Sequence, residues 1–186
     1  MIGFAMCGSY CTHKRSLEEL RKLIQEGHDV LPILSDNSYS TDTRFGDAKE
    51  LQNRLYDICG KYPIHTVVDA EPLGPKISLD ALVICPCTGN TLAKMAQGIT
   101  DTSVSMAAKA HLRGDRPLII ALASNDALSA NLKNIATMLN RKHVYFVPMF
   151  QDDPQKKPHS LIADFSLLIP TLDAAMEGKQ YQKIFI

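Results

Sequence analysis

Short apolar runs alternate along the chain with longer stretches in which apolar residues recur at helical spacing. The apolar runs predict buried strands at Ile2–Met6, Val30–Leu34, 64–68, 81–85, 118–122 and 144–147. The helical spacing predicts helices at 17–26, 51–59, 92–97, 103–113, 132–139 and 161–176. Strands that alternate with helices are typical of α/β proteins with a parallel sheet. We therefore expect one domain, residues 1–186, with a doubly wound parallel sheet in three α/β/α layers.

A few residues predict where these elements begin and end. Ser16 and Glu19 have the spacing of a capping box and predict the start of the first helix. Pro86 has no backbone N–H, so we expect it to end the fourth strand. Gly98 predicts a helix C-cap, and Pro170 predicts a kink or break in the last helix. The residues after that helix are expected to be extended or mobile.

Polar turns follow four of the predicted strands at their carboxyl ends. They are Gly8-Ser9, Ser35, 87–91 and Ser124-Asn125. Because parallel strands end at the same edge of the sheet, where ligands bind, one shared ligand site explains all four turns. The segment 83–101 adds a strand, a tight polar turn and a helix N-terminus, an arrangement that favours anions. The same residues could instead serve only as helix caps.

Composition narrows the functional classes. The 186 residues include 20 lysines and arginines and 20 aspartates and glutamates, so no net charge favours nucleic acid or an anionic membrane. No apolar run is long enough to span a bilayer, and the first residues lack the basic region of a signal peptide. Five cysteines, an odd number, indicate reduced thiols and a cytoplasmic protein.

The candidate chemistry points to a single phosphate rather than to a metal or a dinucleotide. Cys7 with Cys11, and Cys85 with Cys87, lack the spacing of zinc knuckles, so we expect no metal site and small buried thiols. The chain has no GxGxxG, Walker A or GxSxG motif. Its six histidines are scattered, and we expect surface or locally bonded side chains rather than bases. Hydroxyls and a glycine at strand ends suit the phosphate of a mononucleotide.

The string PCTGNTLAKMAQGITDTSVSMAAKAHLRGDRPLIIAL resembles the core of the FMN-binding flavoproteins, which include cysteine decarboxylases and flavin prenyltransferases. The family shares a strand, then P-x-[ST]-x-N-T-[LI]-A-K, then G-[IL]-x-D, and the first turn, CGSYC, looks like its T-G-S turn. The resemblance runs over nearly the whole chain. It implies a Rossmann-like flavoprotein fold and FMN as the cofactor.

The residues that the resemblance assigns to the flavin site are small or polar side chains at the strand ends. Those near the FMN phosphate are Gly8, Ser9 and Ser35. Those of the second wall are Cys87, Thr88, Asn90, Thr91 and Lys94. Those that complete this wall at the next helix start are Asp101 and Ser103. Those near the flavin or substrate edge are Ser124, Asn125 and Asp126. No residue is assigned a catalytic role.

The chain departs from the two best-known activities of the family. The decarboxylases have a histidine before the central strand, where this chain reads EPLGPKISL. Their P-A-M-N segment is replaced here by Ala123-Ser124-Asn125-Asp126, and the arginine–glutamate pair of the prenyltransferases is absent. The resemblance therefore does not carry cysteine decarboxylation or flavin prenylation over to this chain.

Four further segments, TRFG, AEPLGPK, LASNDAL and YFVPMFQDDPQKKP, are similar to one branch of the family. Members of this branch are flavin subunits of a synthase that oxidises a small dihydropyridine dicarboxylate in the mother cell of a spore-forming bacterium. The resemblance implies one component of an oxidoreductase that assembles as a homo-oligomer based on trimers, together with a companion protein that uses NAD(P). Cationic contacts to the dicarboxylate could come from Arg44, Lys76, Lys94 or Lys109. The alternatives are a flavin-dependent decarboxylase and a non-catalytic FMN-binding scaffold.

Overall fold

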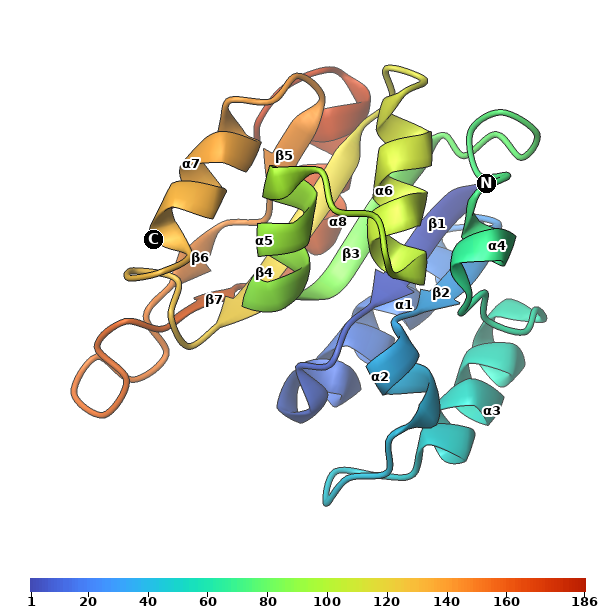
Figure 1. Cartoon of the computed structure of the whole chain (residues 1–186), viewed down its shortest axis with the longest axis horizontal. Helices are drawn as coiled ribbons and strands as arrows, with labels where there is room; N and C mark the ends of the chain where they lie inside the picture. The colour runs from blue at the N-terminus through green and yellow to red at the C-terminus, as the bar shows by residue number, and fades with distance from the viewer.

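A seven-stranded sheet forms the centre of the computed structural model, which describes all 186 residues (Figure 1). The strands are β1 (Ile2–Met6), β2 (Val30–Leu34), β3 (Ala81–Thr88), β4 (Leu118–Ser124), β5 (Val144–Phe146), β6 (Met149–Phe150) and β7 (Leu161–Ala163). Their order is β2-β1-β3-β4-β7-β6, and β5 also pairs with β4. Strands β1 to β5 pair with one another in parallel, whereas β7 is antiparallel to both β4 and β6. The predicted parallel sheet is confirmed, with an antiparallel extension at one edge.

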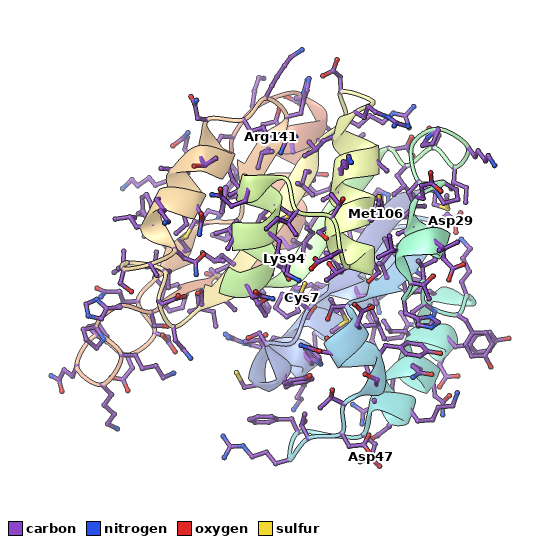
Figure 2. The ribbon with its side chains drawn as sticks, viewed as in Figure 1. Cys7, Asp29, Asp47, Lys94, Met106 and Arg141 are labelled. Atoms are coloured by element: carbon purple, nitrogen blue, oxygen red, sulfur yellow. The ribbon has the colours of Figure 1, made fainter.

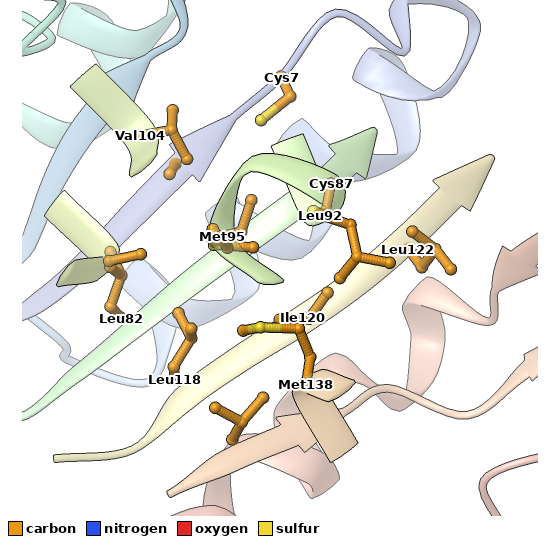
Figure 3. Close-up of a cluster of buried hydrophobic side chains, with 14 of the residues drawn as sticks. Cys7, Leu82, Cys87, Leu92, Met95, Val104, Leu118, Ile120, Leu122 and Met138 are labelled. Atoms are coloured by element: carbon orange, nitrogen blue, oxygen red, sulfur yellow. The ribbon is translucent and has the colours of Figure 1, made fainter. Parts of the chain in front are cut away.

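Helices cover both faces of this sheet. They are α1 (His13–Gln25), α2 (Asp36–Ser40), α3 (Ala48–Cys59), α4 (Val67–Ala70), α5 (Gly89–Gln97), α6 (Ser103–Leu112), α7 (Leu132–Leu139) and α8 (Leu168–Met176), with short 3-10 turns at Tyr10–Thr12 and Phe165–Leu167. One buried cluster joins the sheet to α1, α3 and α8. A second cluster joins the other face of the sheet to α4, α5, α6 and α7, and Figure 3 shows part of it. The predicted three-layer α/β/α arrangement is therefore confirmed. None of the helices has the length and apolar character needed to cross a membrane.

The predicted capping box at the start of the first helix is wrong. Helix α1 begins at His13, directly after the 3-10 turn, and its N-cap is Thr12. Ser16 lies inside the helix, fully buried, and its hydroxyl donates a hydrogen bond to the carbonyl of Cys85 on β3. Glu19 accepts a hydrogen bond from Lys22 instead of from the backbone. The sequence spacing was present, but the preceding turn already starts the helix one turn earlier.

The prediction that Pro86 ends the fourth strand is also wrong, because β3 continues to Thr88. The register between β3 and β4 shifts there, so that Ile84 pairs with Ile120 but Cys87 pairs with Leu122. One extra residue on β3 forms a bulge, and the missing N–H of Pro86 falls inside it. The bulge also reverses the side-chain alternation, since Cys85 packs on the α1 face, whereas Cys87 packs on the α5 face (Figure 3).

Two further predicted elements differ from the structure. The weak strand at 64–68 is absent: Ile64 makes one isolated bridge to Ile33, and α4 begins at Val67. The long helix at 161–176 is instead strand β7, a 3-10 turn and α8. Pro170 lies in the first turn of α8, where a missing N–H costs no intrahelical bond. The apolar run at its start supplies β7, so its helical periodicity was misleading.

Candidate functional site

The four polar turns meet at the carboxyl edge of the sheet, where they line two joined clefts. The Lys94 cleft, of about 420 Å³, lies between the ends of β1, β2 and β3. The Asp126 cleft, of about 530 Å³, lies between the ends of β1, β3 and β4. Gly8, Thr88 and Asn90 line both clefts, so the two form one continuous hollow. Together they are as large as the ligand pockets of typical enzymes.

Most of the residues expected at the site line these clefts. Those in the Lys94 cleft are Gly8, Ser35, Thr88, Asn90, Thr91, Lys94 and Asp101. Those in the Asp126 cleft are Gly8, Ser9, Thr88, Asn90, Ser124, Asn125 and Asp126. Their assignment to a flavin stays a prediction that rests on the family resemblance. The convergence of the turns follows directly from the parallel topology of the strands that carry them.

Cys87 and Ser103 are the two expected site residues that do not reach either cleft. Cys87 is fully buried in the apolar cluster under α5, and this burial raises the pKa of its thiol well above the usual value (Figure 3). Ser103 is fully buried at the start of α6, and its hydroxyl donates a 2.6 Å hydrogen bond to the carbonyl of Leu34. Both residues therefore support the walls of the site from behind.

Two of the site hydroxyls also cap helices. Thr88 is the N-cap of α5, and its Oγ1 accepts a hydrogen bond from the backbone N–H of Thr91. Ser35 is the N-cap of α2 and accepts from the N–H of Ser38 in the same way. The hydroxyl of Thr91 lies 3.3 Å from the sulfur of Cys7, which ties α5 to the end of β1. Capping and a ligand role are thus compatible, since these helix starts form the cleft walls.

The only lysine of the Lys94 cleft is bound to a carboxylate. The Nζ atom of Lys94, on α5 (Figure 2), lies 2.8 and 3.0 Å from the two carboxylate oxygens of Asp101. This contact lowers the pKa of Asp101 below its ordinary value. Asp36 adds a second carboxylate to the same cleft. An anion that enters here must therefore compete with Asp101 for the ammonium group.

The Asp126 cleft contains a hydrogen-bonded network around its carboxylate. The hydroxyl of Ser124 donates to Oδ1 of Asp126 at 2.5 Å, and Nδ2 of Asn131 lies 2.9 and 3.0 Å from the two carboxylate oxygens. These hydrogen bonds, that of Ser124 first, lower the pKa of Asp126. Gly89 packs directly against the network: a Cβ there would lie 2.4 Å from Oγ of Ser124. Only a glycine fits at this start of α5.

Sequence reasoning missed several residues that line the clefts. Tyr10, Asn37 and Thr102 contribute to the Lys94 cleft, and Asn131 to the Asp126 cleft. Asn131 directly precedes the predicted helix at 132–139, and a polar residue at such a position is a usual N-cap signal. That signal could have placed Asn131 at the same sheet edge, whereas its network with Asp126 depends on how α7 packs.

A third, smaller cleft adjoins the first two. This Lys157 cleft, of about 100 Å³, shares Ser9, Ser124 and Asn125 with the Asp126 cleft and lies beside the loop at 151–158. Lys157 forms a 2.8 Å ion pair with Asp152 in this loop. No histidine lines any of the three clefts, and no three acidic, histidine or cysteine side chains converge as metal ligands.

Comparisons with known proteins give a consistent result. Residues 1–166 match the family model named Flavoprotein. The chain is 42% identical over 185 residues to the B subunit of dipicolinate synthase from Bacillus subtilis (strain 168), and the match covers 100% of this chain and 92% of that protein. It superimposes on the B subunit of dipicolinate synthase from Bacillus halodurans with a TM-score of 0.91 and 40% identity, over 100% and 95% of the two chains.

A more distant match has the same fold. It is a dodecameric, FMN-dependent, UbiX-like decarboxylase from Escherichia coli O157:H7, with a TM-score of 0.61 and 20% identity over 80% of each chain.

Proposed function

Because the chain belongs to the Flavoprotein family, we propose that it binds FMN across the two joined clefts. The Lys94 cleft supplies five hydroxyls and one ammonium group, which suit a phosphate; they come from Tyr10, Ser35, Thr88, Thr91, Thr102 and Lys94. The Asp126 cleft supplies amides and the small side chains Ala93 and Ala123, which suit a flat heterocycle.

We propose that the chain is the flavin subunit of a dipicolinate synthase. The support is the match to the B subunit of that enzyme at 42% identity over the full chain. In this role the protein oxidises a dihydropyridine dicarboxylate to dipicolinate, and FMN supplies the hydride acceptor when bound. The residues of this chain position the two molecules, and the partner, the A subunit of dipicolinate synthase, carries NAD(P).

Two other functions remain open to test. A flavin-dependent decarboxylase fits the fold; because the three clefts contain no histidine, its base would be another group, such as the carboxylate of Asp126. A non-catalytic FMN-binding scaffold for a nicotinamide-dependent partner fits the same clefts equally well. The oxidoreductase role is preferred because of the similarity over the whole length to the B subunit of the synthase.

Flavin titration tests the FMN site. Adding apo-protein to FMN should quench flavin fluorescence, and Asn90→Leu should abolish this quenching because Asn90 lines both clefts. Asn53→Leu is the matched control, since Asn53 is an exposed residue of α3 outside these clefts. Unchanged fluorescence with wild-type protein at high micromolar concentration would exclude the FMN site.

A reconstitution assay tests the division of work between the two proteins of the synthase. Dipicolinate formation is followed by its ultraviolet absorbance with this chain alone, the partner alone, and both together in the presence of NAD(P). Turnover is expected only with both. Full turnover by this chain alone would disprove the need for a partner, and full turnover by the partner alone would reduce this chain to an accessory.

We also propose a homo-oligomer based on trimers. The support is that the E. coli decarboxylase of the same fold is a dodecamer; the small residues of α6 pack inside this chain's own core and are not available to another copy. Light scattering of the FMN-loaded protein should give a mass at least threefold that of one chain. A monomeric mass at working concentration would contradict this.

A further inference from the structure

The Asp126 cleft, where we place the flavin ring, carries one negative charge. Among its 11 lining residues Asp126 is the only one with a charged side chain, and the others offer hydroxyls, amides or small apolar groups. The lysines of the adjoining clefts are each bound to a carboxylate, Lys94 to Asp101 and Lys157 to Asp152. A group in the Asp126 cleft therefore lies beside one negative charge that no cation of the cleft compensates.

The carboxylate of Asp126 is also fixed in place. Its three hydrogen bonds come from Ser124 and Asn131, whose side chains are both buried, and Gly89 closes the network from the start of α5. These donors hold the group ionised at neutral pH, since they lower its pKa. An ionised carboxylate accepts about four hydrogen bonds, so one acceptor position on Oδ2 stays without a protein donor. The negative charge thus persists at the cleft wall.

Such a charge acts differently on the two redox states of a flavin. Oxidised FMN has a neutral ring, and addition of a hydride brings one hydrogen and two electrons, so the ring becomes anionic. A fixed carboxylate beside the ring repels this anion and leaves the neutral form unaffected to first order. The reduced state is therefore disfavoured relative to free FMN.

We propose that Asp126 lowers the reduction potential of the flavin held in its cleft. The inference rests on the proposed FMN site and adds a redox-tuning residue to it. A low potential also restricts the hydride donors that the site can use. A flavin at low potential accepts a hydride only from a strongly reducing substrate and is readily reoxidised. A dihydropyridine is such a donor, because the loss of hydride and a proton leaves an aromatic ring.

The test is the reduction potential of the FMN-loaded protein, measured anaerobically against reference dyes. Wild-type protein should have a lower potential than free FMN. Asp126→Asn removes the charge and keeps the shape, and it should raise the ratio of reduced to oxidised flavin at a given potential by about tenfold, about 30 mV for a two-electron couple. Asp57→Asn is the control, because it removes one carboxylate from the exposed surface of α3, outside the clefts; its potential should stay near the wild-type value.

Each outcome shows whether the charge of Asp126 sets the potential of the flavin. Equal potentials for wild type and Asp126→Asn overturn the inference, and so does an equal shift in Asp57→Asn, which would indicate an effect of net charge rather than of the carboxylate in the cleft. A wild-type potential at or above that of free FMN overturns it without any variant, so the test holds even where Asp126→Asn does not fold. If wild-type protein binds no FMN, the proposed function fails and this inference fails with it.

Discussion

Gly89 shows how one absent side chain shapes the candidate site. A Cβ at this position would lie 2.4 Å from Oγ of Ser124 and 2.6 Å from Nδ2 of Asn131, closer than real Cβ contacts. Gly89→Ala must therefore push the network away from the start of α5. We expect FMN affinity to fall by about tenfold or more, because about 1.4 kcal/mol of lost contact is tenfold in binding. Fluorescence titration measures it.

Gly114→Ala is the control for this substitution. Its nearest contact would be 3.3 Å, to the carbonyl of His111, and it lies beyond the end of α6, away from the clefts. Affinity for FMN should be unchanged. If both alanine variants bind FMN as wild type does, the Gly89 network is not part of the ligand site.

The five cysteines, all free thiols, should react very unequally. Burial raises the pKa of Cys7 to about 11 and that of Cys85 to about 12. A raised pKa keeps a thiol protonated at neutral pH, so the reactive thiolate appears only as the pH rises toward that value. Exposed Cys11 should therefore react with iodoacetamide on the order of 100-fold faster than the buried thiols at neutral pH.

Peptide mass spectrometry of partially alkylated protein gives these rates. Cys11→Ser should remove the fast phase and leave the slow modification unchanged. Modification of Cys85 as fast as that of Cys11 would show that the β3 core opens readily.

At the residue scale, the sequence predicted most of the residues that line the clefts but not the hydrogen-bonded network around Asp126. Polar side chains at four strand ends were sufficient, because parallel topology brings those ends together. Cys87, which the resemblance assigns to the second wall of the flavin site, does not reach either cleft, because the bulge in β3 turns its side chain into the apolar cluster under α5. Neither a bulge nor the contact between Asn131 and Asp126 has a local signature, since both depend on neighbouring elements.

Among the elements, the contact between α1 and β3 shows that sequence spacing does not reveal hydrogen bonds between distant elements. Ser16 fits a capping box by spacing, yet in the structure it joins α1 to the carbonyl of Cys85 across the core. Ser16→Ala should lower the free energy of unfolding by about 1 to 2 kcal/mol, because a buried carbonyl then loses its donor. Urea unfolding followed by circular dichroism measures this loss.

Ser40→Ala serves as the comparison for Ser16→Ala. Ser40 is exposed at the end of α2, and its hydroxyl donates a hydrogen bond to the carbonyl of Asp36. Water can take the place of this donor in the alanine variant. Its substitution should change stability by less than about 0.5 kcal/mol. Equal losses in the two variants would mean that the buried hydrogen bond contributes nothing particular.

The predicted helix at 161–176 was wrong for a related reason, because its first residues pair with distant strands. The run at 161–176 has helical periodicity, but its first residues pair with the ends of β4 and β6 as strand β7. Strands made of three residues carry too little pattern to be recognised alone. By contrast, the long apolar runs of β1 and β2 and the helix at Leu132–Leu139 were predicted with the bounds that the structure gives.

For the whole molecule, the two buried clusters pack on opposite faces of one sheet, so neither cluster can form without the strands that the other also covers. The clusters of 24 and 21 buried residues lie on opposite faces of the same strands. We therefore propose that residues 1–186 unfold as a single domain. Thermal unfolding should show one transition, with equal calorimetric and van't Hoff enthalpies. Two resolved transitions would divide the chain instead.

The C-terminal tail covers the edge of the sheet that would otherwise be open to other molecules. Backbone N–H and carbonyl groups of Met149, on the outermost strand β6, bond to Ile184 and Ile186 at 2.7 and 3.1 Å. The side chain of Gln180 likewise bonds to the N–H and carbonyl of Phe146. The chain thus shields its own open strand edge, which otherwise could template pairing with another molecule.

Removal of residues 180–186 should therefore make the protein self-associate through that edge. Static light scattering of the shortened chain should rise with time and concentration, whereas Phe185→Lys, which keeps the backbone contacts, should stay clear. If the shortened chain remains as well dispersed as the full one, the tail is not a guard against aggregation. If it aggregates, the last seven residues act as a built-in protection of solubility, independent of any ligand.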